Sequence, residues 1–384
     1  MSTLTLAQYR IGLLFSTKGT YGTTSAEMLK GAQLAVAEVN AERGDTFLAS
    51  IEADPAGQLG RYTELTADLL DAGVRHIVGC DTSQSRKEVI PLIEKRDALL
   101  WYPAHYEGFE ALPNLVYTGA APNQHVMPLI DYMTQNFRLR ACCVGSNYVW
   151  AWETNRVVRE TLQARGGRIF SERYVPLEET DFSQIVSEIL RLRPSFVFST
   201  LVGDSSLEFI LALRSACLAE GIEQKRVLPL LSCNLSEVVV AAAGSRGGDG
   251  HISSNTYFST VESVANRRFV AAYRARFGGL TTADAESAYL SVRLLAQALA
   301  VAGNDGVDAV RQAVKTQRLQ APQGEVWIDP DTMHAALKPR IGRSRADGTY
   351  EILWEAARPV MPDPYLVRAA LPVASALAPL RLVS

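Results

Sequence analysis

The fold is decided by residues 76–110, which read HIVGCDTSQSRKEVIPLIEKRDALLWYPAHYEGFE. The stretch begins with a short apolar strand, His76–Gly79, and continues with a turn rich in hydroxyl groups at Cys80–Ser85. Arg86–Lys95 then carries apolar residues at helical spacing, and Leu99–Trp101 is a second buried strand. This order of strand, helix and strand predicts two parallel strands joined by a right-handed crossover.

A polar loop follows each of the two predicted strands. The carboxyl ends of adjacent parallel strands lie at one edge of an open α/β sheet, where such sheets bind small molecules. Residues 81–85 would also lie at the amino end of the helix, where free backbone N–H groups favour a carbonyl or an anion. We therefore expect a site formed by Asp81–Ser85 and Tyr102–Tyr106. The alternative interpretation is a capped helix followed by an ordinary surface loop.

The composition bounds the class of protein. A chain of 384 residues predicts two or three domains, and 47% hydrophobic with 21% charged residues is typical of a globular protein with a large core. A net charge of −3 and a pI near 6.0 argue against a nucleic-acid surface. The sequence has no apolar run near the ~18 residues of a membrane span. The start, MSTLTLAQYRIGLLFS, has no basic region or cleavage site, so we expect a cytoplasmic location.

The sequence offers no clear catalytic or metal-binding motif. Five cysteines and five scattered histidines fit neither a disulfide framework nor a metal site, so no metal and no cofactor is expected. Phosphate-binding loops, dinucleotide fingerprints and GxSxG elbows are also missing. Cys80 or Cys233 as a nucleophile beside His105 or Glu107 is an alternative, but no base is tied to either thiol by spacing. We expect a binding protein and not an enzyme.

Two series of alternating strands and helices predict the architecture. They indicate an α/β protein with two doubly wound parallel-sheet lobes, and three helices after Phe258 are expected to return to the first lobe. The lobes would be joined by three crossings, near Ala121–Asn123, Ser253–Thr256 and Gln320–Gly324, which permits hinge closure of a cleft. The predicted parts are an N-terminal lobe (residues 1–121 and 256–322), a C-terminal lobe (122–255 and 323–365) and a tail (366–384).

The side chains that follow the predicted strands are mostly hydroxyls, amides and aromatic rings. Such a lining suits a small, mostly neutral polar molecule, although each aromatic residue taken alone is more often part of a core. These residues are Ser83, Ser85, Tyr102, Tyr106, Tyr148, Trp150, Thr200, Asn234 and Tyr257.

Several segments resemble one branch of the type I periplasmic-binding-protein fold, which holds urea and short-chain-amide binding proteins and the AmiC-type regulators of amidase operons. The similarity runs from Tyr9 to about Tyr365, and the ending Pro362–Tyr365 favours the AmiC type. The segments are VGCDTSQSRKEVIP, LLWYPAHYEGFE, VYTGAAPNQH, VGSNYVWAWETN and APQG.

The resemblance implies a cytoplasmic sensor without catalysis that binds a small aliphatic amide between its lobes. Its partner would be an RNA-binding antiterminator of the AmiR type, and a homodimer is expected, with no direct contact to nucleic acid or membrane. The alternative function is the substrate-binding component of a urea or short-chain-amide ABC transporter.

The resemblance also implies a set of site residues. Ser83 would hydrogen-bond the amide, Tyr102 and Tyr148 would supply walls and polar contacts, and Glu237 matches a recurrent acidic position across the cleft. The family's ligand contacts fall on Ser83, Tyr102, Ala104 and Tyr148, with Asp81, His105, Trp150 and Val202 close by.

Three residues depart from the family pattern. Asp81 stands where an aromatic residue is usual, Ala104 replaces a hydroxyl residue, and His105 replaces a proline. A carboxylate and an imidazole in the site favour a ligand with more hydrogen-bond donors, or a cation. The alternative is that Asp81 faces solvent and caps the following helix.

Overall fold

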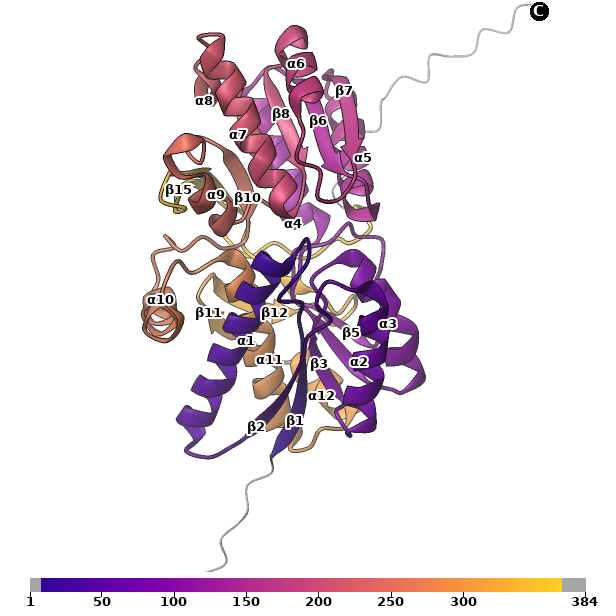
Figure 1. Cartoon of the computed structure of the whole chain (residues 1–384). Helices are drawn as coiled ribbons and strands as arrows, with labels where there is room; N and C mark the ends of the chain where they lie inside the picture. The colour runs from indigo at the N-terminus through magenta and orange to yellow at the C-terminus, as the bar shows by residue number, and fades with distance from the viewer. Residues whose placement is uncertain (1–7, 368–384) are drawn as a thin grey trace, which may run out of the picture.

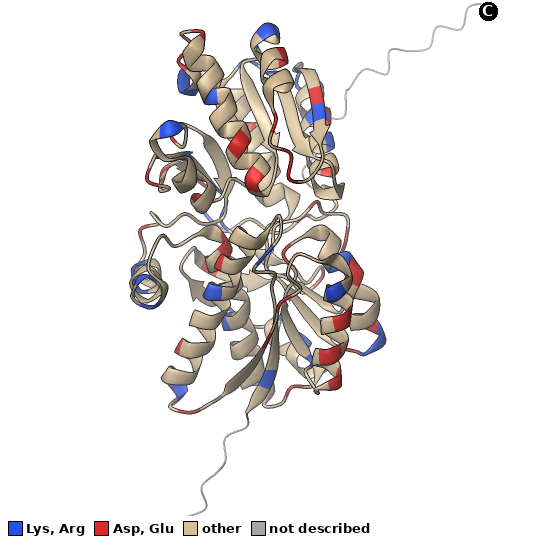
Figure 2. Ribbon diagram, viewed as in Figure 1, with Lys and Arg blue, Asp and Glu red and all other residues tan. Residues whose placement is uncertain are grey.

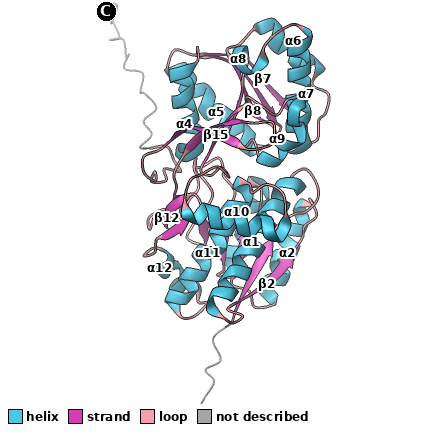
Figure 3. Cartoon of the chain, turned by 90° about the vertical axis from the view of Figure 1, so that its left-hand side faces the viewer, coloured by secondary structure: helices cyan, strands magenta, loops and turns pink. Residues whose placement is uncertain are grey.

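The computed structural model describes residues 8–367 of the chain. They form two α/β lobes stacked along the long axis of the molecule (Figure 1), with several chain segments passing between the lobes (Figure 3). Basic and acidic residues are interspersed over both lobes in the view of Figure 2. Within this part of the chain, no helix combines the length and the apolar character needed to cross a bilayer.

The lower lobe of Figure 1 contains a five-stranded parallel sheet of order β2-β1-β3-β4-β5. All residues of β3 and β4 are buried, as expected for a parallel sheet covered on both faces. The strands are β1 (Tyr9–Leu14), β2 (Leu48–Ala53), β3 (His76–Gly79), β4 (Leu99–Tyr102) and β5 (Leu115–Tyr117).

Helices from both ends of the sequence cover this sheet. A Cβ atom on Gly31 of α1 would lie 1.9 Å from the carbonyl oxygen of Ala285 in α11, so glycine permits the two helices to approach closely. The helices are α1 (Gly22–Arg43), α2 (Leu59–Asp71), α3 (Ser83–Lys95), α11 (Ala283–Ala302) and α12 (Val307–Val314), with α10 (Val264–Phe277) beside α1.

The upper lobe contains a seven-stranded mixed sheet of order β15-β14-β10-β9-β8-β6-β7. Its last two strands, β14 (Arg340–Ser344) and β15 (Tyr350–Glu355), pair antiparallel. The parallel strands are β6 (Arg140–Ser146), β7 (Arg168–Val175), β8 (Phe196–Thr200), β9 (Leu230–Ser232) and β10 (Ile252–Asn255). The helices are α4 (Pro122–Asn136), α5 (Val149–Ala164), α6 (Ser183–Leu192), α7 (Gly203–Ala219), α8 (Gln224–Val227) and α9 (Glu237–Ala243).

The chain passes between the lobes after β5, after β10 and again before β14. The predicted fold of two doubly wound lobes is thereby confirmed. The third passage lies later than Gln320–Gly324, because Val326, Ile328 and Leu337 still pack in the core of the lower lobe. A small sheet precedes it, formed by β11 (Leu319–Ala321), β12 (Gly324–Ile328) and β13 (Ala335–Ala336). The predicted tail lies, from residue 368 on, outside the described residues.

Candidate ligand-binding site

The turn between β3 and α3 directs polar side chains towards the other lobe. Cys80 takes a positive φ of 64°, a conformation that few non-glycine residues adopt, and so turns the chain sharply after β3. Thr82 is the N-cap of α3: its side chain accepts a hydrogen bond from the Ser85 backbone N–H, and the Ser85 hydroxyl accepts one from the Thr82 N–H. The helix start is therefore capped without Asp81.

Asp81 is buried and points into the cleft. Its carboxylate accepts a short hydrogen bond from the Tyr62 hydroxyl and a longer one, of 3.4 Å, from the Ser85 hydroxyl. Burial raises the pKa of Asp81, and the hydrogen bonds from Tyr62 and Ser85 oppose that rise. The alternative in which Asp81 faces solvent and caps the helix is wrong, because Thr82 occupies the cap.

A cavity of about 60 Å³ lies between the lobes at this turn. Seven of the eight residues at or close to the family's ligand contacts line it: Asp81, Ser83, Ala104, His105, Tyr148, Trp150 and Val202. The other lining residues are Tyr21, Thr24, Met28, Thr82, Leu201, Gly203, Ser206, Asn234, Ser236, Val239 and Asp284. The structure thus brings together loops at the carboxyl ends of strands in both sheets, as the strand order predicts.

Tyr102 lies behind the wall of the cavity instead of lining it. Its side chain is fully buried, and its ring lies 4.7 Å from the guanidinium carbon of Arg86. Tyr106 lies on the same guanidinium at 4.8 Å, and its hydroxyl donates to the Glu110 carbonyl. These two aromatic rings therefore hold a buried cation in place. Likewise Thr200 donates to Asn155, and Tyr257 packs in the core of the lower lobe.

Ser83 connects the cavity to this buried cation. The Ser83 hydroxyl donates a short hydrogen bond to Oε2 of Glu107, and Oε1 of Glu107 accepts one of 3.2 Å from Nη2 of Arg86. Arg86 also donates to Glu110, over 2.9 Å between Nε and Oε1. Ser83, Arg86 and Glu107 are all at most 4% exposed. The orientation of the Ser83 hydroxyl is consequently fixed by charged groups outside the cavity.

The charged residues that line the cavity are acidic. Asp284, at the start of α11, accepts a hydrogen bond of 2.9 Å from the Ser236 hydroxyl of the upper lobe. Burial, with a smaller contribution from the charge of Glu27, raises the pKa of Asp284 to about 6. Among the described residues that line the cavity, none is Lys or Arg. When ionised, these carboxylates accept hydrogen bonds and repel anions.

Glu237 lies next to the cavity and not in its wall. Oε2 of its carboxylate accepts a hydrogen bond of 3.2 Å from the Ala283 backbone N–H, and burial raises its pKa to about 8. It therefore joins α9 of the upper lobe to the start of α11. The acidic position that the resemblance indicated contributes an interlobe contact in this structure.

Aromatic rings form the opposite wall. Tyr148 and Trp150 stack at 6.1 Å and 30°, and the His105 ring lies 5.2 Å from Trp150 and 5.4 Å from His125. Burial lowers the pKa of His105 to about 4, so this imidazole is neutral at pH 7. The Trp150 indole N–H is buried and has no acceptor among residues 8–367. It is a free donor, and the wall also holds the hydroxyl of Tyr21, which likewise has no partner among residues 8–367.

Asp284, Tyr21 and Thr24 are site residues that the sequence analysis missed. Tyr21 is the N-cap of α1 and Thr24 lies in the first turn of that helix, and their sequence, rich in glycine and hydroxyl residues, did not indicate a site. Asp284 is the second residue after the α11 N-cap, Thr282, and only the return of this helix to the lower lobe carries it to the cleft. The return of α11 was predicted, and it is the signal in the sequence that leads to Asp284.

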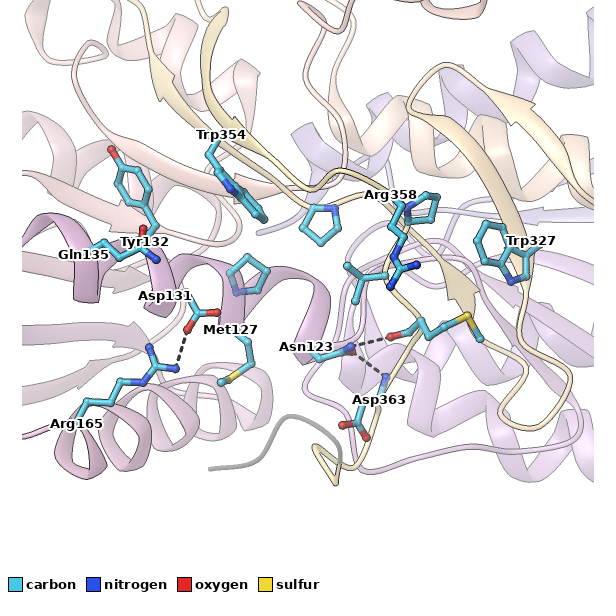
Figure 4. A pocket seen from close by; sticks show the side chains of 15 residues that line it. Asn123, Met127, Asp131, Tyr132, Gln135, Arg165, Trp327, Trp354, Arg358 and Asp363 are labelled. Atoms are coloured by element: carbon cyan, nitrogen blue, oxygen red, sulfur yellow. Dashed lines mark hydrogen bonds and ion pairs between the residues drawn. The ribbon is translucent and has the colours of Figure 1, made fainter. Parts of the chain in front are cut away.

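A larger hollow, of about 970 Å³, lies on another face of the molecule (Figure 4). Figure 4 shows Trp354 and Trp327 over this hollow and the ion pair between Asp131 and Arg165 at its rim. It contains none of the predicted site residues. The part of the chain that the structure describes also contains no group of three or more His, Cys, Asp or Glu arranged to hold a metal ion.

Comparison with known proteins identifies the family. The model for the periplasmic binding protein domain matches residues 9–370. The chain belongs to this family. A curated relative, the Leu/Ile/Val-binding protein homolog 6 of Brucella suis, is 22% identical over 354 residues, which are 89% of each chain. A limonene hydroxylase of Geobacillus stearothermophilus is 23% identical over only 130 residues, and the chain spans 24% of its length.

Solved structures of this fold include ABC transporter components. The solute-binding protein of an R. palustris ABC transporter, in complex with benzoate, has a TM-score of 0.83 at 20% identity, over 93% of this chain and 98% of that one. The branched-chain amino acid transporter substrate-binding protein LivJ of Streptococcus pneumoniae, in complex with isoleucine, has a TM-score of 0.76 at 19% identity, over 93% and 100%. At these identities the likeness is one of fold.

These findings correct several expectations. The family is named for periplasmic binding proteins, and the relatives and structural neighbours are named as binding proteins of transporters. The expected cytoplasmic amide sensor of an amidase operon, its role in transcription regulation and its AmiR-type antiterminator partner are therefore wrong. The chain shares a ligand-binding fold, and the transporter alternative agrees better with the comparisons.

Proposed function

We propose that this chain is the substrate-binding component of an ABC transporter for a small uncharged solute of the urea or short-chain-amide class. In this function it acts in the periplasm, without catalysis, and delivers its solute to a membrane permease. Membership of the periplasmic binding protein domain family and the transporter names of its relatives support the transport role. The solute class rests on the cavity.

The size and charge of the cavity carry the choice of solute. Pockets that hold drug-sized ligands measure ~300–1,000 Å³, and this cavity, of about 60 Å³, is far smaller. Urea and acetamide are of this size, whereas benzoate and isoleucine are considerably larger. Asp81 and Asp284, with no Lys or Arg in the described wall, also oppose a carboxylate ligand. A small solute with several N–H groups and one carbonyl fits both properties.

The carbonyl of such a solute has a partner in the wall. The free indole N–H of Trp150 is a donor, while Ser83 and the two aspartates are acceptors for N–H groups. Tyr148, stacked against Trp150, gives a planar solute an aromatic surface. These roles for Ser83, Tyr148, Trp150 and Asp81 belong to the proposal.

The test is a thermal-shift screen of the purified protein, followed by calorimetric titration. The panel is urea, formamide, acetamide and propionamide, with benzoate and isoleucine as the ligands of the structural neighbours. A ligand that binds only the folded state raises the melting temperature by mass action. We expect a shift with urea or an amide, a smaller shift in Ser83→Ala, and an unchanged one in Ser183→Ala, an exposed serine of α6.

Two outcomes contradict the proposal. Stabilisation by benzoate or isoleucine, with none by urea or any amide, would mean that the solute class is wrong. Release of ammonia from an amide during incubation would mean that the chain is an enzyme.

A further inference from the structure

We propose that Glu107 is a positioning residue that makes the cavity select N–H donors over carboxylates, because it holds the Ser83 hydroxyl as an acceptor. This inference rests on the proposed function and extends it to one residue outside the cavity wall. It predicts that the polarity of the site, and with it the choice between an amide and its isosteric carboxylate, is set by Glu107.

The hydrogen bonds that Ser83 makes within the protein determine whether it can donate to a ligand or accept from it. A hydroxyl has one proton to donate and two lone pairs to accept with. The Ser83 proton goes to Oε2 of Glu107, and one lone pair faces Nη1 of Arg86 at 3.5 Å. What remains for a ligand is a single lone pair. Ser83 can therefore accept from an N–H group, and it has no proton for a carboxylate.

The pair behind Ser83 keeps this arrangement in place. Glu107 is 4% exposed, and Oε1 accepts from Nη2 of Arg86 at 3.2 Å, which leaves Oε2 for Ser83. Arg86 is fixed in turn between the rings of Tyr102 and Tyr106. Reversal of the Ser83 hydroxyl would leave a buried carboxylate oxygen without its donor, which is costly. The donor direction is thus determined by a charged pair that lies outside the cavity wall.

Two other residues of the cavity wall are hydrogen-bond acceptors, as Ser83 is. Asp81 and Asp284 are further acceptors, and their partners are the hydroxyls of Tyr62, Ser85 and Ser236. A solute with several N–H groups can satisfy these acceptors together. A carboxylate in the same position would meet three sets of lone pairs.

Glu107→Gln should turn Ser83 from an acceptor into a donor towards the cavity, because the glutamine side chain has the same shape as glutamate. The carboxamide oxygen would remain on Nη2 of Arg86, because that guanidinium is a donor. The amide NH₂ then faces the Ser83 oxygen, so Ser83 accepts from it and turns its own proton to the cavity. A matched control is Glu110→Gln, since Glu110 also accepts from Arg86, over 2.9 Å, but does not contact Ser83.

The experiment is calorimetric titration of wild type, Glu107→Gln, Glu110→Gln and Ser83→Ala with acetamide, acetate and urea at pH 7.5. We expect Glu107→Gln to lower the acetamide-to-acetate affinity ratio by about tenfold or more, the effect of one hydrogen bond. Glu110→Gln should leave the ratio unchanged. In the background of Ser83→Ala, Glu107→Gln should no longer alter the ratio, because its effect passes through that hydroxyl.

Several results decide between failure of this inference and failure of the proposed function. A ratio that is equal in wild type and Glu107→Gln, or that falls equally in Glu110→Gln, overturns the inference while amide binding stands. If the wild type binds neither urea nor acetamide, the proposed function is wrong and the inference falls with it. If Glu107→Gln does not fold, Ser83→Ala decides alone: a loss of acetamide affinity with unchanged or improved acetate affinity supports the acceptor role, and an unchanged ratio refutes it.

Discussion

Replacement of Asp284 by asparagine should stabilise the protein at neutral pH. The folded chain raises the pKa of this carboxyl from 3.8 to about 6 through burial, followed by the charge of Glu27. In the unfolded chain the pKa returns to its ordinary value. Folding therefore favours the protonated carboxyl. The difference of about 2.2 units corresponds to roughly 3 kcal/mol at 1.36 kcal/mol per unit.

The direction of this pKa shift determines how the free energy of unfolding depends on pH. Below pH 3.8 the carboxyl is protonated in both states and its full contribution to stability is present. Between pH 3.8 and about 6 the unfolded chain ionises first, so stability falls as pH rises, and above pH 6 the loss is complete. Asp284→Asn lacks this term but keeps an oxygen that can accept from Ser236. The variant should thus match the wild type at pH 3.5 and exceed it by up to about 3 kcal/mol at pH 8.

The assay is unfolding in guanidinium chloride from pH 3.5 to pH 8, followed by circular dichroism. Urea is unsuitable as denaturant because it is a candidate ligand. Asp54→Asn is a control whose pH dependence has the opposite sign. Burial favours a higher pKa for Asp54, but hydrogen bonds from Thr17 and Ala56 outweigh it and lower the pKa, so the stability that Asp54 contributes is lost as pH falls. A difference between Asp284→Asn and wild type that does not grow between pH 4 and pH 7 would refute the reasoning.

Three further outcomes follow from the cleft. Tyr62→Phe removes a hydrogen bond to buried Asp81 and should lower the free energy of unfolding by about 1–3 kcal/mol at pH 8, measured in guanidinium chloride; an unchanged value contradicts that bond. Gly203→Ala puts a Cβ 2.2 Å from the Thr20 carbonyl oxygen of the other lobe, so small-angle scattering should show a more open molecule. Titration should show the solute affinity of this variant reduced about tenfold or more. Gly221→Ala, also at positive φ but without a neighbour within 4 Å, should show neither effect, and equal behaviour of the two variants argues against the interlobe clash. Thr20→Val removes the 2.8 Å bond to Glu178 at the exposed cleft edge and should weaken solute binding less than fivefold, below about 1 kcal/mol; a larger loss in titration would mean that this contact controls closure.

The fold could be predicted because its signals are local. Residues 76–110 show their strands as apolar runs and their helix as a 3.6-residue period, and short connections leave one hand of crossover. The general rule for parallel sheets then indicated the loops at Asp81 and Tyr148, which the structure brings to one cavity. The third passage between lobes was misplaced because β12 and β13 are too short to show which core covers them.

Details of the site depend on contacts between distant segments. Tyr102 is at the carboxyl end of its strand, where the rule for parallel sheets places ligand-binding residues. Its ring nevertheless packs on Arg86, a direction that the alternation of side chains along a strand does not predict. Asp284 comes from a helix that begins some 200 residues after Asp81, and only the three-dimensional return of α11 brings the two carboxylates to one cavity. The sequence indicated Glu107 only as a candidate base beside a cysteine, because its contacts with Ser83 and the buried Arg86 join separate segments.

The raised pKa values connect stability to solute binding. Burial raises the pKa of Asp81 and of Asp284, and their protein partners are hydroxyls, so the cleft in this structure holds carboxyl groups whose ionised form is disfavoured. A solute that donates N–H groups to them favours the ionised form and therefore the closed arrangement over the open one, which is the differential affinity that closure requires. Asp284→Asn should accordingly gain stability without solute and gain less from solute than the wild type does. If Asp284→Asn is more stable than the wild type without solute, and urea or acetamide stabilises both proteins equally, the Asp284 carboxylate takes no part in ligand recognition.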